Sequence, residues 1–438
     1  MARQFRVIPA SAAKLDPNAN VADVVFVGSN GKPTDIGSAA VKPATHVALA
    51  AGATPTKSEF DALVNSLMGL AWLQRLGHRP IVLAGGGTGM IGDPSMKSAE
   101  RNLLTMDQIR HNVEGVKKQL MHFVSFDCGE NSALLVNNYD WLSAMNFLEF
   151  LRDVGKFFTI NKMIAKEHVR SRIEDPTKSL SFTEFAYTLL QSYDFYHLYT
   201  TYGCRLQLGG NDQQGNITSG IDFIRKHEEG AAVYGGTNPL LLTSAGHKFG
   251  KTEGGAVWLD PAKTSPYQFY QFWVNNEDAT IAKTLRYFTF LPLDEIDALV
   301  ARHMQSPEKR EAQRVLAYEI TKLVHGENVA ANARHASEIL FGGSYTPEDL
   351  TEDMLHTLAA ETPCGKVASL PVPLADALAE VGACKSKGEA KRLIAGGGVS
   401  VNGVRVDEGA QLEDRDVLCG YFSLIRLGKK KYFMIGRK

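Results

Sequence analysis

Two lysines lie three residues apart on a glycine-bracketed segment, Gly246-His247-Lys248-Phe249-Gly250-Lys251-Thr252-Glu253-Gly254-Gly255. Glycine lets a backbone turn at either sign of φ, and paired ammonium groups on such a loop suit a polyanion such as a triphosphate. The spacing from Gly246 to Gly250 is one residue too short for a P-loop. The segment therefore predicts a phosphate-gripping loop of another kind, and an exposed hairpin with solvated lysines is the alternative.

A second glycine run follows a predicted buried strand. Residues 80–84 form the continuous apolar run expected in a parallel sheet that is covered on both faces. Residues 85–92 then contain the pattern G-x-G-x-x-G, but a proline follows Asp93 where a dinucleotide site needs a helix. A dehydrogenase is therefore only a distant alternative. Asp93, Lys97 and Arg101 nevertheless follow the end of a strand, where open α/β sheets bind ligands.

Three polar side chains share one face of a predicted helix over residues 181–195. Tyr187, Gln191 and Asp194 stand at i, i+4 and i+7 among aromatic residues. A predicted strand and a polar turn follow over residues 205–216. An ordinary polar helix face is the alternative, but inward-pointing polar groups need partners, and a polar ligand can supply them.

Composition limits the class of protein that carries these groups. The chain has 438 residues, 44% hydrophobic and 22% charged, with a formal net charge of -1. That length is enough for about two to four domains. The near-zero net charge argues against a protein that is basic over its whole surface, but it allows a local basic patch. No membrane span or signal-peptide core is evident, so we expect a cytoplasmic protein without a membrane. Five widely spaced cysteines predict neither a disulfide framework nor a bound metal.

Helices are predicted between these motifs. Ser58 caps a helix that ends at Gly77, and Ser306 caps one that has Pro307 at its first position and ends before Gly326. Further helices are expected at about 105–123, 140–154 and 161–173.

The end of the chain predicts a small basic module. Helices are expected from residue 374 and from residue 387, and Asn402-Gly403 is a strong two-residue hairpin signal. The last eighteen residues carry six basic side chains and no acid, interleaved with apolar residues typical of strands. Such a module suits a phosphate backbone, whereas the alternative is a solvated basic tail. The candidate RNA-binding residues are Lys387, Lys391, Arg392, Lys429, Lys430 and Lys431.

Six motifs stand along the chain: Gly92-Asp93-Pro94-Ser95, Asn137-Asn138-Tyr139-Asp140-Trp141, Ser181-Phe182-Thr183-Glu184-Phe185, Gln191-Ser192-Tyr193-Asp194-Phe195, Gly215-Asn216-Ile217-Thr218-Ser219-Gly220 and residues 248–255. With these motifs the chain, from about Met68 to Lys438, resembles the bacterial-type tyrosyl-tRNA synthetases, which are class I aminoacyl-tRNA synthetases. The resemblance implies an α/β, Rossmann-like parallel-sheet catalytic domain, followed by an α-helical domain and a small α+β RNA-binding domain. It also implies ATP-dependent activation of L-tyrosine, transfer to tRNA(Tyr), Mg²⁺ accompanying ATP, and a homodimer.

The resemblance implies a role for each candidate residue. Lys248, Lys251 and Thr252 correspond to the family's Lys-Met-Ser-Lys-Ser loop, where fixed cations hold the pyrophosphate leaving group. Asp194 accepts a hydrogen bond from the phenol of tyrosine, so phenylalanine leaves this buried acceptor unpaired. The remaining assignments place Asp93, Tyr187, Gln191 and Gln213 at the ammonium group and its surroundings, Gly210 and Asp212 at the adenylate, and Lys97 and Arg101 at the mobile-loop and transfer steps.

The first 66 residues depart from the family pattern. A tyrosine on the first strand and His-x-Gly-His at the next helix are typical of the family, but this chain has residues 47–50, Val-Ala-Leu-Ala, and residues 60–63, Phe-Asp-Ala-Leu, at those places. Loss of the imidazoles removes groups that stabilise charge on the reacting phosphates. The alternative function is therefore a catalytically impaired synthetase-like protein or N-terminal chimera that keeps tRNA or tyrosine binding.

The predicted organisation has five parts. They are an atypical N-terminal segment replacing the first part of the Rossmann domain at 1–66, the catalytic domain with its signature loop at 67–262, a helical anticodon-side domain at 263–345, a linker with one short helix at 346–370, and the RNA-binding domain at 371–438.

Overall fold

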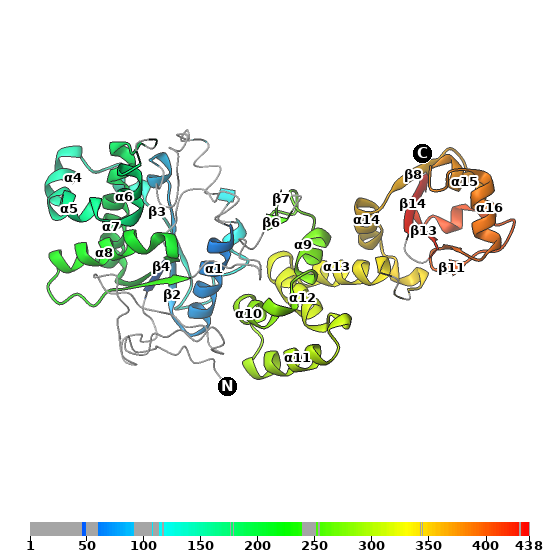
Figure 1. Cartoon of the computed structure of the whole chain (residues 1–438), viewed down its shortest axis with the longest axis horizontal. Helices are drawn as coiled ribbons and strands as arrows, with labels where there is room; N and C mark the ends of the chain where they lie inside the picture. The colour runs from blue at the N-terminus through cyan, green and yellow to red at the C-terminus, as the bar shows by residue number, and fades with distance from the viewer. Residues whose placement is uncertain are drawn as a thin grey trace. The chain divides into compact units, whose positions relative to one another are not determined.

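The structure is a computed structural model (Figure 1) that describes residues 46–49, 60–91, 107, 114–115, 118–175, 177, 179–238, 251–252, 255–341, 343, 345–428 and 431–437. The chain divides into two compact units, Met1–Val257 with Glu277–Arg302, and Trp258–Asn276 with His303–Lys438. Among the described residues, no helix combines the length and apolar character needed to cross a membrane.

The first unit is built on a five-stranded parallel sheet with the strand order β3-β2-β1-β4-β5. Its central strand, β1, comes from the N-terminal segment, since Ala48 pairs with Ile81 on one side and with Gln207 on the other. The predicted α/β class is therefore confirmed. The strands are β1 (His46–Leu49), β2 (Arg79–Ala84), β3 (Leu134–Asn137), β4 (Cys204–Gly210) and β5 (Tyr234–Asn238).

Helices cover both faces of this sheet (Figure 1). Helix α1 (Phe60–Arg75) lies on one face, and α7 (Phe182–Tyr202) and α8 (Gln214–His227) lie on the other. Strand β2 is buried on both sides, as its continuous apolar run predicts, and Ile81 and Leu83 pack in one cluster with residues of α7 and α8. Helix α1 also packs on Phe290, since the ring of Trp72 lies 4.9 Å from that ring.

The close packing of α8 on the sheet depends on glycine. A Cβ atom added to Gly235 on β5 would lie 2.3 Å from Cγ2 of Ile217, and one on Gly209 of β4 would lie 2.9 Å from Cβ of Gln213. Any larger residue would push α8 away from the strands. These two glycines therefore set the position of the helix that begins at Gln214.

Two predicted helices are each broken into two. The helix expected at 140–154 is α3 (Tyr139–Leu142) and α4 (Phe147–Asp153), because Asn146 is extended and its side chain accepts a hydrogen bond from Leu148 N, which starts a new helix. The helix expected at 161–173 is α5 (Ile160–Ile164) and α6 (Glu167–Ile173), with Lys166 extended between them.

The first unit also contains α10 (Asp278–Phe288) and most of α11 (Leu293–Gln305), and helices α9, α12, α13 and α14 belong to the second. The prediction of a helix that starts at Pro307 is wrong at its N-terminal end, because the α-helix, α12, begins at Glu311. Residues Pro307–Lys309 form a separate 3-10 turn, η5, and Arg310 has a φ of 51°, which ends the turn before α12 begins. Its guanidinium donates to Val274 O at 2.7 Å, a contact that no local pattern contains. The second-unit helices are α9 (Pro266–Val274), α12 (Glu311–His325), α13 (Glu327–Leu340) and α14 (Glu352–Glu361).

The segment predicted as a linker, 346–370, holds η6 (Pro347–Asp349), α14 and the strand β8 (Cys364–Val367). Leu355 and Leu358 of α14 are fully buried, so the single short helix expected there is part of a hydrophobic core. Strand β8 pairs in parallel with β14 (Lys431–Arg437) and becomes the edge of the C-terminal sheet.

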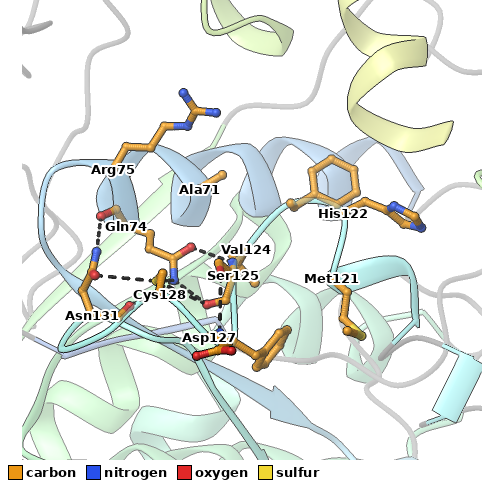
Figure 2. A pocket seen from close by; sticks show the side chains of 12 residues that line it. Ala71, Gln74, Arg75, Met121, His122, Val124, Ser125, Asp127, Cys128 and Asn131 are labelled. Carbon is orange, nitrogen blue, oxygen red and sulfur yellow. Dashed lines mark hydrogen bonds between the residues drawn. The ribbon is translucent and has the colours of Figure 1, made fainter. Parts of the chain in front are cut away.

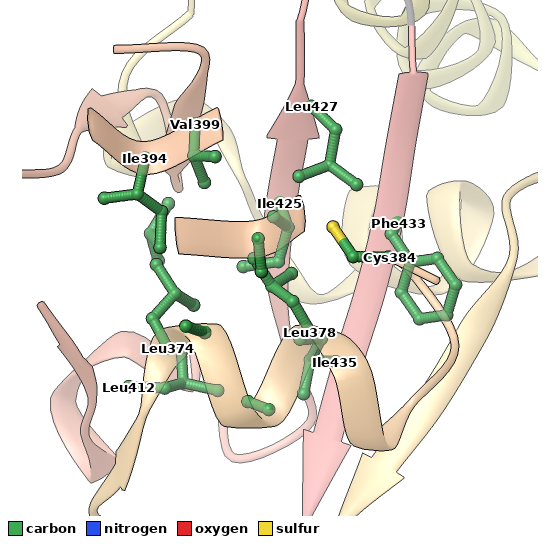
Figure 3. Close-up of a cluster of buried hydrophobic side chains, with 14 of the residues drawn as sticks. Leu374, Leu378, Cys384, Ile394, Val399, Leu412, Ile425, Leu427, Phe433 and Ile435 are labelled. Atoms are coloured by element: carbon green, nitrogen blue, oxygen red, sulfur yellow. The ribbon is translucent and has the colours of Figure 1, made fainter. Parts of the chain in front are cut away.

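The C-terminal module is a five-stranded sheet with the order β11-β10-β13-β14-β8, packed on α15 (Leu374–Glu380) and α16 (Lys387–Ala395). Along β14, Phe433 and Ile435 enter the cluster drawn in Figure 3, whereas Tyr432 and Met434 pack on the opposite face with α13 and α14. This alternation buries both faces of the strand. The other strands are β9 (Val372–Pro373), β10 (Val399–Val401), β11 (Val404–Arg405), β12 (Gln411–Leu412) and β13 (Phe422–Leu427).

The hairpin predicted at Asn402-Gly403 is confirmed. The two residues join the antiparallel strands β10 and β11 and have φ values of 49° and 85°. Positive φ at both positions is the conformation of a type I′ turn, which the Asn-Gly pair favours.

Candidate active site

The polar residues of the first unit gather where three parallel strands end. The turn η2 (Thr88–Met90) follows β2, Asn138 follows β3, and η4 (Asn211–Gln213) follows β4. The carboxyl ends of parallel strands share one edge of the sheet, which is the edge where open α/β folds bind ligands. Helix α7 brings its own polar face to the same edge through Asp194.

Asp194 is the centre of this arrangement and is 1% exposed. Its Oδ1 accepts a hydrogen bond of 2.8 Å from Trp141 Nε1, and its Oδ2 accepts one of 2.9 Å from Asn138 Nδ2. Two carboxylate oxygens offer about four acceptor sites, so each oxygen keeps room for a further donor. Asp194 is therefore a fixed acceptor that can receive a hydroxyl from a ligand.

Burial raises the pKa of the Asp194 carboxyl to about 7, although the hydrogen bonds from Asn138 and Trp141 lower it in part. A carboxylate without a cationic neighbour loses hydration when it is buried, so its charged form becomes less stable. A strongly perturbed pKa in a buried polar cluster is typical of functional sites.

Asn138 ties the glycine run to this carboxyl. Its Nδ2 donates to Thr88 Oγ1 at 2.9 Å as well as to Asp194, and its Oδ1 accepts from Gly87 N at 2.8 Å. The neighbouring Asn137 Oδ1 accepts from Gly86 N at 3.1 Å. The N–H groups of Gly86 and Gly87 are thus already bonded, which argues against the dinucleotide interpretation of G-x-G-x-x-G.

The predicted polar face of α7 does point inward. Tyr187 and Gln191 are 1% and 5% exposed, and both lie on the buried side of the helix with Asp194. Within the described part of the chain, Gln191 Nε2 has no hydrogen-bond partner, and neither amide atom of the fully buried Gln207 on β4 has one. Buried amide groups left open in this way are explained by a polar ligand that would complete them.

Gln213 and Asp212 meet at the end of β4, as their places in the sequence predict. Gln213 is 6% exposed, and its Nε2 donates to Asp212 Oδ2 at 2.9 Å. Gly210 is buried at the strand end just before them. The structure therefore places six of the predicted residues in the first unit at described positions near this edge: Tyr187, Gln191, Asp194, Gly210, Asp212 and Gln213.

Several predicted residues lie outside the described part of the chain. They are Asp93, Lys97, Arg101, Lys248, Lys429 and Lys430. Of the signature loop, the backbones of Lys251 and Thr252 form β6 (Lys251–Thr252), which pairs antiparallel with β7 (Gly255–Ala256).

The predicted RNA-binding residues that are described lie in the C-terminal module. Lys391 and Arg392 are exposed on α16, and Lys431 is exposed at the start of β14. Lys387, at the start of α16, forms an ion pair of 3.1 Å with Asp376 Oδ2 of α15. An exposed ion pair of this kind is weak, so Lys387 can exchange its partner for a phosphate.

Four residues of the site were not assigned a role from the sequence: Thr88, Asn138, Trp141 and Gln207. Asn138 and Trp141 belong to a motif that the resemblance contains, but nothing local indicates that they face Asp194. Gln207 lies between two leucines on β4, and a polar residue between apolar neighbours on a buried strand is the signal that could have identified it.

A separate cavity of about 600 Å³ lies between α1 and residues 121–131, and none of the predicted site residues lines it. Figure 2 shows Gln74 of α1 reaching the facing loop. Gln74 Oε1 accepts from Ser125 N at 2.8 Å, and its Nε2 donates to Ser125 O at 2.7 Å and to Asn131 O at 3.0 Å. These bonds hold the loop on the helix and account for the 7% exposure of this glutamine.

Comparison with known proteins gives two family matches. The model for tRNA synthetases class I (W and Y) matches residues 44–342, and the model for the tyrosine–tRNA ligase SYY-like C-terminal domain matches residues 354–435. The first match begins upstream of Met68, where we predict the resemblance to start, and it includes β1 and α1.

Similar proteins include the tyrosine–tRNA ligase of Anaeromyxobacter dehalogenans, 47% identical over 408 residues that cover 90% of this chain and 95% of the relative. The tyrosine–tRNA ligase of Roseiflexus castenholzii is 48% identical over 373 residues, which cover 84% and 88%. Among solved structures, a C-terminally truncated mitochondrial tyrosyl-tRNA synthetase of Aspergillus nidulans has a TM-score of 0.60 at 29% identity and covers 68% of this chain and 86% of that one.

Proposed function

This chain belongs to the family of class I tRNA synthetases for tryptophan and tyrosine, and from that membership we propose that its buried Asp194 carboxyl selects tyrosine. The chain is an ATP-using tyrosine–tRNA ligase of protein biosynthesis. The observation that carries the proposal is a carboxylate held by two donors with acceptor capacity left over.

The phenol of tyrosine fits this acceptor. A phenol hydroxyl donates one hydrogen bond, and an Asp194 oxygen accepts it without losing its bonds to Asn138 or Trp141. Phenylalanine would leave the buried carboxylate desolvated and without that bond, which costs about 1–3 kcal/mol or more for a charged group. The Asp194 carboxyl therefore favours tyrosine over phenylalanine.

The amino-acid end of tyrosine is assigned to the polar groups farther along the edge. We assign the ammonium group and its surroundings to Tyr187, Gln191 and Gln213 together with Asp93. A glutamine amide offers an acceptor for an ammonium group and a donor for a carboxyl group. The open Nε2 of Gln191 supports this assignment, since a bound amino acid would complete it.

The nucleotide is assigned to the strand end and the signature loop. Gly210 and Asp212 contact the adenylate. The signature-loop residues Lys248, Lys251 and Thr252 hold the departing pyrophosphate. Lys97 and Arg101 serve the mobile-loop and transfer steps. The lysines would act as fixed cations where negative charge develops. Mg²⁺ enters with ATP, because this ion keeps several waters and is usually held by substrate phosphates with one or two carboxylates. We place the reaction in the cytoplasm.

The tRNA is assigned to the basic residues of the C-terminal module. The exposed ammonium and guanidinium groups of Lys391, Arg392 and Lys431 support contacts with a phosphate backbone, which fix position without reading sequence. The same role is assigned to Lys387, Lys429 and Lys430. Such contacts predict that tRNA binding weakens steeply with salt.

A homodimer is proposed through the short helices of the first unit. Large apolar side chains are exposed on α4, α5, α6 and the start of α7: Phe147 at 63%, Leu148 at 73%, Ile160 at 56%, Ile173 at 52% and Phe182 at 70%. Exposed apolar patches of this kind mark interaction surfaces. Light scattering of the wild type and of Leu148→Glu measures the mass, and a monomeric wild type would contradict a dimer.

A catalytically impaired synthetase is the second candidate, and one observation favours it. Residues 60–63 read Phe-Asp-Ala-Leu where the family has His-x-Gly-His. Tyrosine-dependent ATP–pyrophosphate exchange separates the two candidates. The proposed function predicts sustained exchange that requires tyrosine, and no exchange at high protein concentration would leave only binding.

A further inference from the structure

A continuous chain of side-chain hydrogen bonds runs from the corner between α5 and α6 to the end of β4. Lys166 Nζ donates to Thr188 Oγ1 at 3.4 Å, and Thr188 Oγ1 donates to Asn216 Oδ1 at 2.8 Å. Asn216 Nδ2 then donates to Gln213 Oε1 at 3.4 Å. Gln213 Nε2 completes the chain by donating to Asp212 Oδ2 at 2.9 Å.

Every donor in this chain points the same way. An ammonium group stands at one end and a carboxylate at the other, so each bond polarises the next in the same sense. The hydroxyl of Thr188 accepts from the lysine and therefore presents its hydrogen to Asn216. That hydrogen fixes which end of the Asn216 amide faces Thr188, and through it which end of the Gln213 amide faces Asp212.

Lys166 is held firmly at the start of the chain. Its backbone is extended between α5 and α6, with φ of -67° and ψ of 134°, and this break in the helix turns the side chain toward α7 and α8. The same Nζ donates to Gly215 O at 3.0 Å and to Ser219 Oγ at 2.6 Å. An ammonium group has three hydrogens, and Thr188, Gly215 and Ser219 offer three acceptors around it.

Lys166 is more buried than the two other lysines beside it. It lines a cavity of about 470 Å³ together with Lys162 and Lys226. Both neighbours are exposed, whereas Lys166 is half-buried among hydrogen-bond acceptors from two helices. Lys162 is therefore a matched control with the same side chain at the same cavity.

We propose that Lys166 is a positioning residue for adenylate formation, acting through Thr188 and Asn216 on Gln213 and Asp212. It touches no substrate. The inference rests on the proposed function, in which Gln213 faces the amino acid and Asp212 the adenylate. Without the lysine, the Thr188 hydroxyl is free to turn to a backbone carbonyl one helical turn earlier, as buried threonines in helices do. The two amides then lose their fixed orientation.

The test compares Lys166→Met and Thr188→Val with the wild type in tyrosine-dependent ATP–pyrophosphate exchange. Each change breaks one link, and we expect kcat/KM to fall about tenfold, the effect of one misdirected buried hydrogen bond. Lys162→Met should stay within about twofold of wild type, and Thr188→Ser, which keeps the hydroxyl, should retain most of the rate. Melting temperatures recorded in parallel separate a loss of folding from a loss of positioning.

The double variant Lys166→Met with Thr188→Val gives the sharpest readout. Two links of one hydrogen-bonded chain should not add in free energy, so the double variant should lose no more than about twentyfold in kcat/KM, rather than the roughly hundredfold of two independent tenfold losses. An additive loss would overturn the proposal. So would unchanged exchange in Lys166→Met with a raised KM for tRNA alone, because that result would make Lys166 a tRNA contact.

Failure of the proposed function gives a different pattern. In that case the wild type itself shows no exchange, and Gln213→Ala changes nothing. A stable tyrosyl-adenylate analogue then serves as the binding probe, measured by calorimetry. The inference predicts tight binding to wild type that weakens about tenfold in Lys166→Met. Equal affinities, or no binding to either protein, would overturn the inference.

Discussion

Asn138 Nδ2 donates a hydrogen bond of 2.9 Å to Asp194 Oδ2, although the two residues are 56 positions apart in the chain. The same amide accepts from Gly87 N and donates to Thr88 Oγ1, so it joins the turn after β2 to the middle of α7. The side chain is fully buried. Asp194, the proposed acceptor for the tyrosine phenol, is therefore held in place by a residue that follows strand β3.

Replacing Asn138 by Ala should therefore weaken tyrosine binding without touching the nucleotide. Asp194 would lose one donor, and Gly87 N–H would be left without its acceptor, so we expect KM for tyrosine to rise about tenfold and KM for ATP to change less than about twofold. Asn146→Ala is the control, because that asparagine only caps α4. Equal changes in both KM values for Asn138→Ala would contradict this account.

The raised pKa of Asp194 should appear as a pH dependence of tyrosine binding. Burial raises that pKa from 3.8 to about 7, so the carboxyl gains its proton as the pH falls through about 7 and becomes a weaker acceptor. KM for tyrosine should fall as the pH rises through this range. Exchange measured over pH 5.5 to 8.5, roughly the span around that pKa, tests this, and Asp194→Asn should lack the step.

The same shift has a defined effect on stability. The folded protein binds this proton more tightly than the unfolded chain, so the contribution of Asp194 to the free energy of unfolding falls as the pH rises from near 3.8 to about 7. Above that range it stays constant. Urea denaturation of wild type and Asp194→Asn over this pH range gives the slope of the unfolding free energy with pH for each protein. The difference between the slopes isolates the contribution of Asp194, and identical slopes would contradict a raised pKa for this carboxyl.

A buried ion pair fixes the start of α7. Arg172 Nη1 lies 2.8 Å from Glu184 Oε1, and each side chain is 4% exposed. Burial acts to raise the pKa of Glu184, but hydrogen bonds from Arg172 and Ser181 bring it below its usual value. Arg172→Met would leave the Glu184 carboxylate buried with hydrogen bonds from Ser181 but without its cation, which should lower the free energy of unfolding by about 3–5 kcal/mol.

Arg170→Met is the matched control for this pair. Arg170 lies 4.0 Å from Glu174, and both side chains are more than half exposed, so its removal should cost less than about 1 kcal/mol. Chemical denaturation measures the free energy of unfolding of both variants, and similar losses of that free energy in the two would refute the role of burial.

The ion pair should also depend on pH. Because the folded pKa of Glu184 is depressed, the stabilisation from the pair should be present at neutral pH and be lost as the pH falls through that folded value.

Local patterns account for the parts of the structure that the sequence predicts correctly. The spacing of Tyr187, Gln191 and Asp194 places them on one buried face of α7, because helical periodicity depends only on nearby residues. The buried strand β2 and the Asn402-Gly403 turn follow from equally local rules.

Contacts between distant residues account for the rest. Arg310 interrupts its predicted helix, and its guanidinium bonds to a carbonyl 36 residues earlier, at Val274. Asn138 and Trp141 become part of the site only when β3 and α7 are brought together by the sheet. The central place of β1 likewise depends on its pairing with β2 and β4. No window of local sequence contains these partners.

Gly403 should be sensitive to substitution for two separate reasons. Its φ is 85°, and an added Cβ atom would lie 2.8 Å from Tyr345 O. Gly409 has a φ of 82° and nothing within 4 Å of such an atom, so it isolates the conformational effect. We expect Gly409→Ala to destabilise the protein by about 1 kcal/mol and Gly403→Ala by clearly more. Equal losses in thermal unfolding would show that the approach to Tyr345 does not matter.

The most direct test of the central claim is the selectivity of ATP–pyrophosphate exchange for tyrosine over phenylalanine, measured in the wild type and in Asp194→Ala. Melting temperatures of both proteins show whether the variant is folded. We predict exchange with strong preference for tyrosine in the wild type, and a preference reduced at least about tenfold in the folded variant, because the phenol loses its acceptor. A variant that keeps the wild-type preference would contradict the assignment of Asp194.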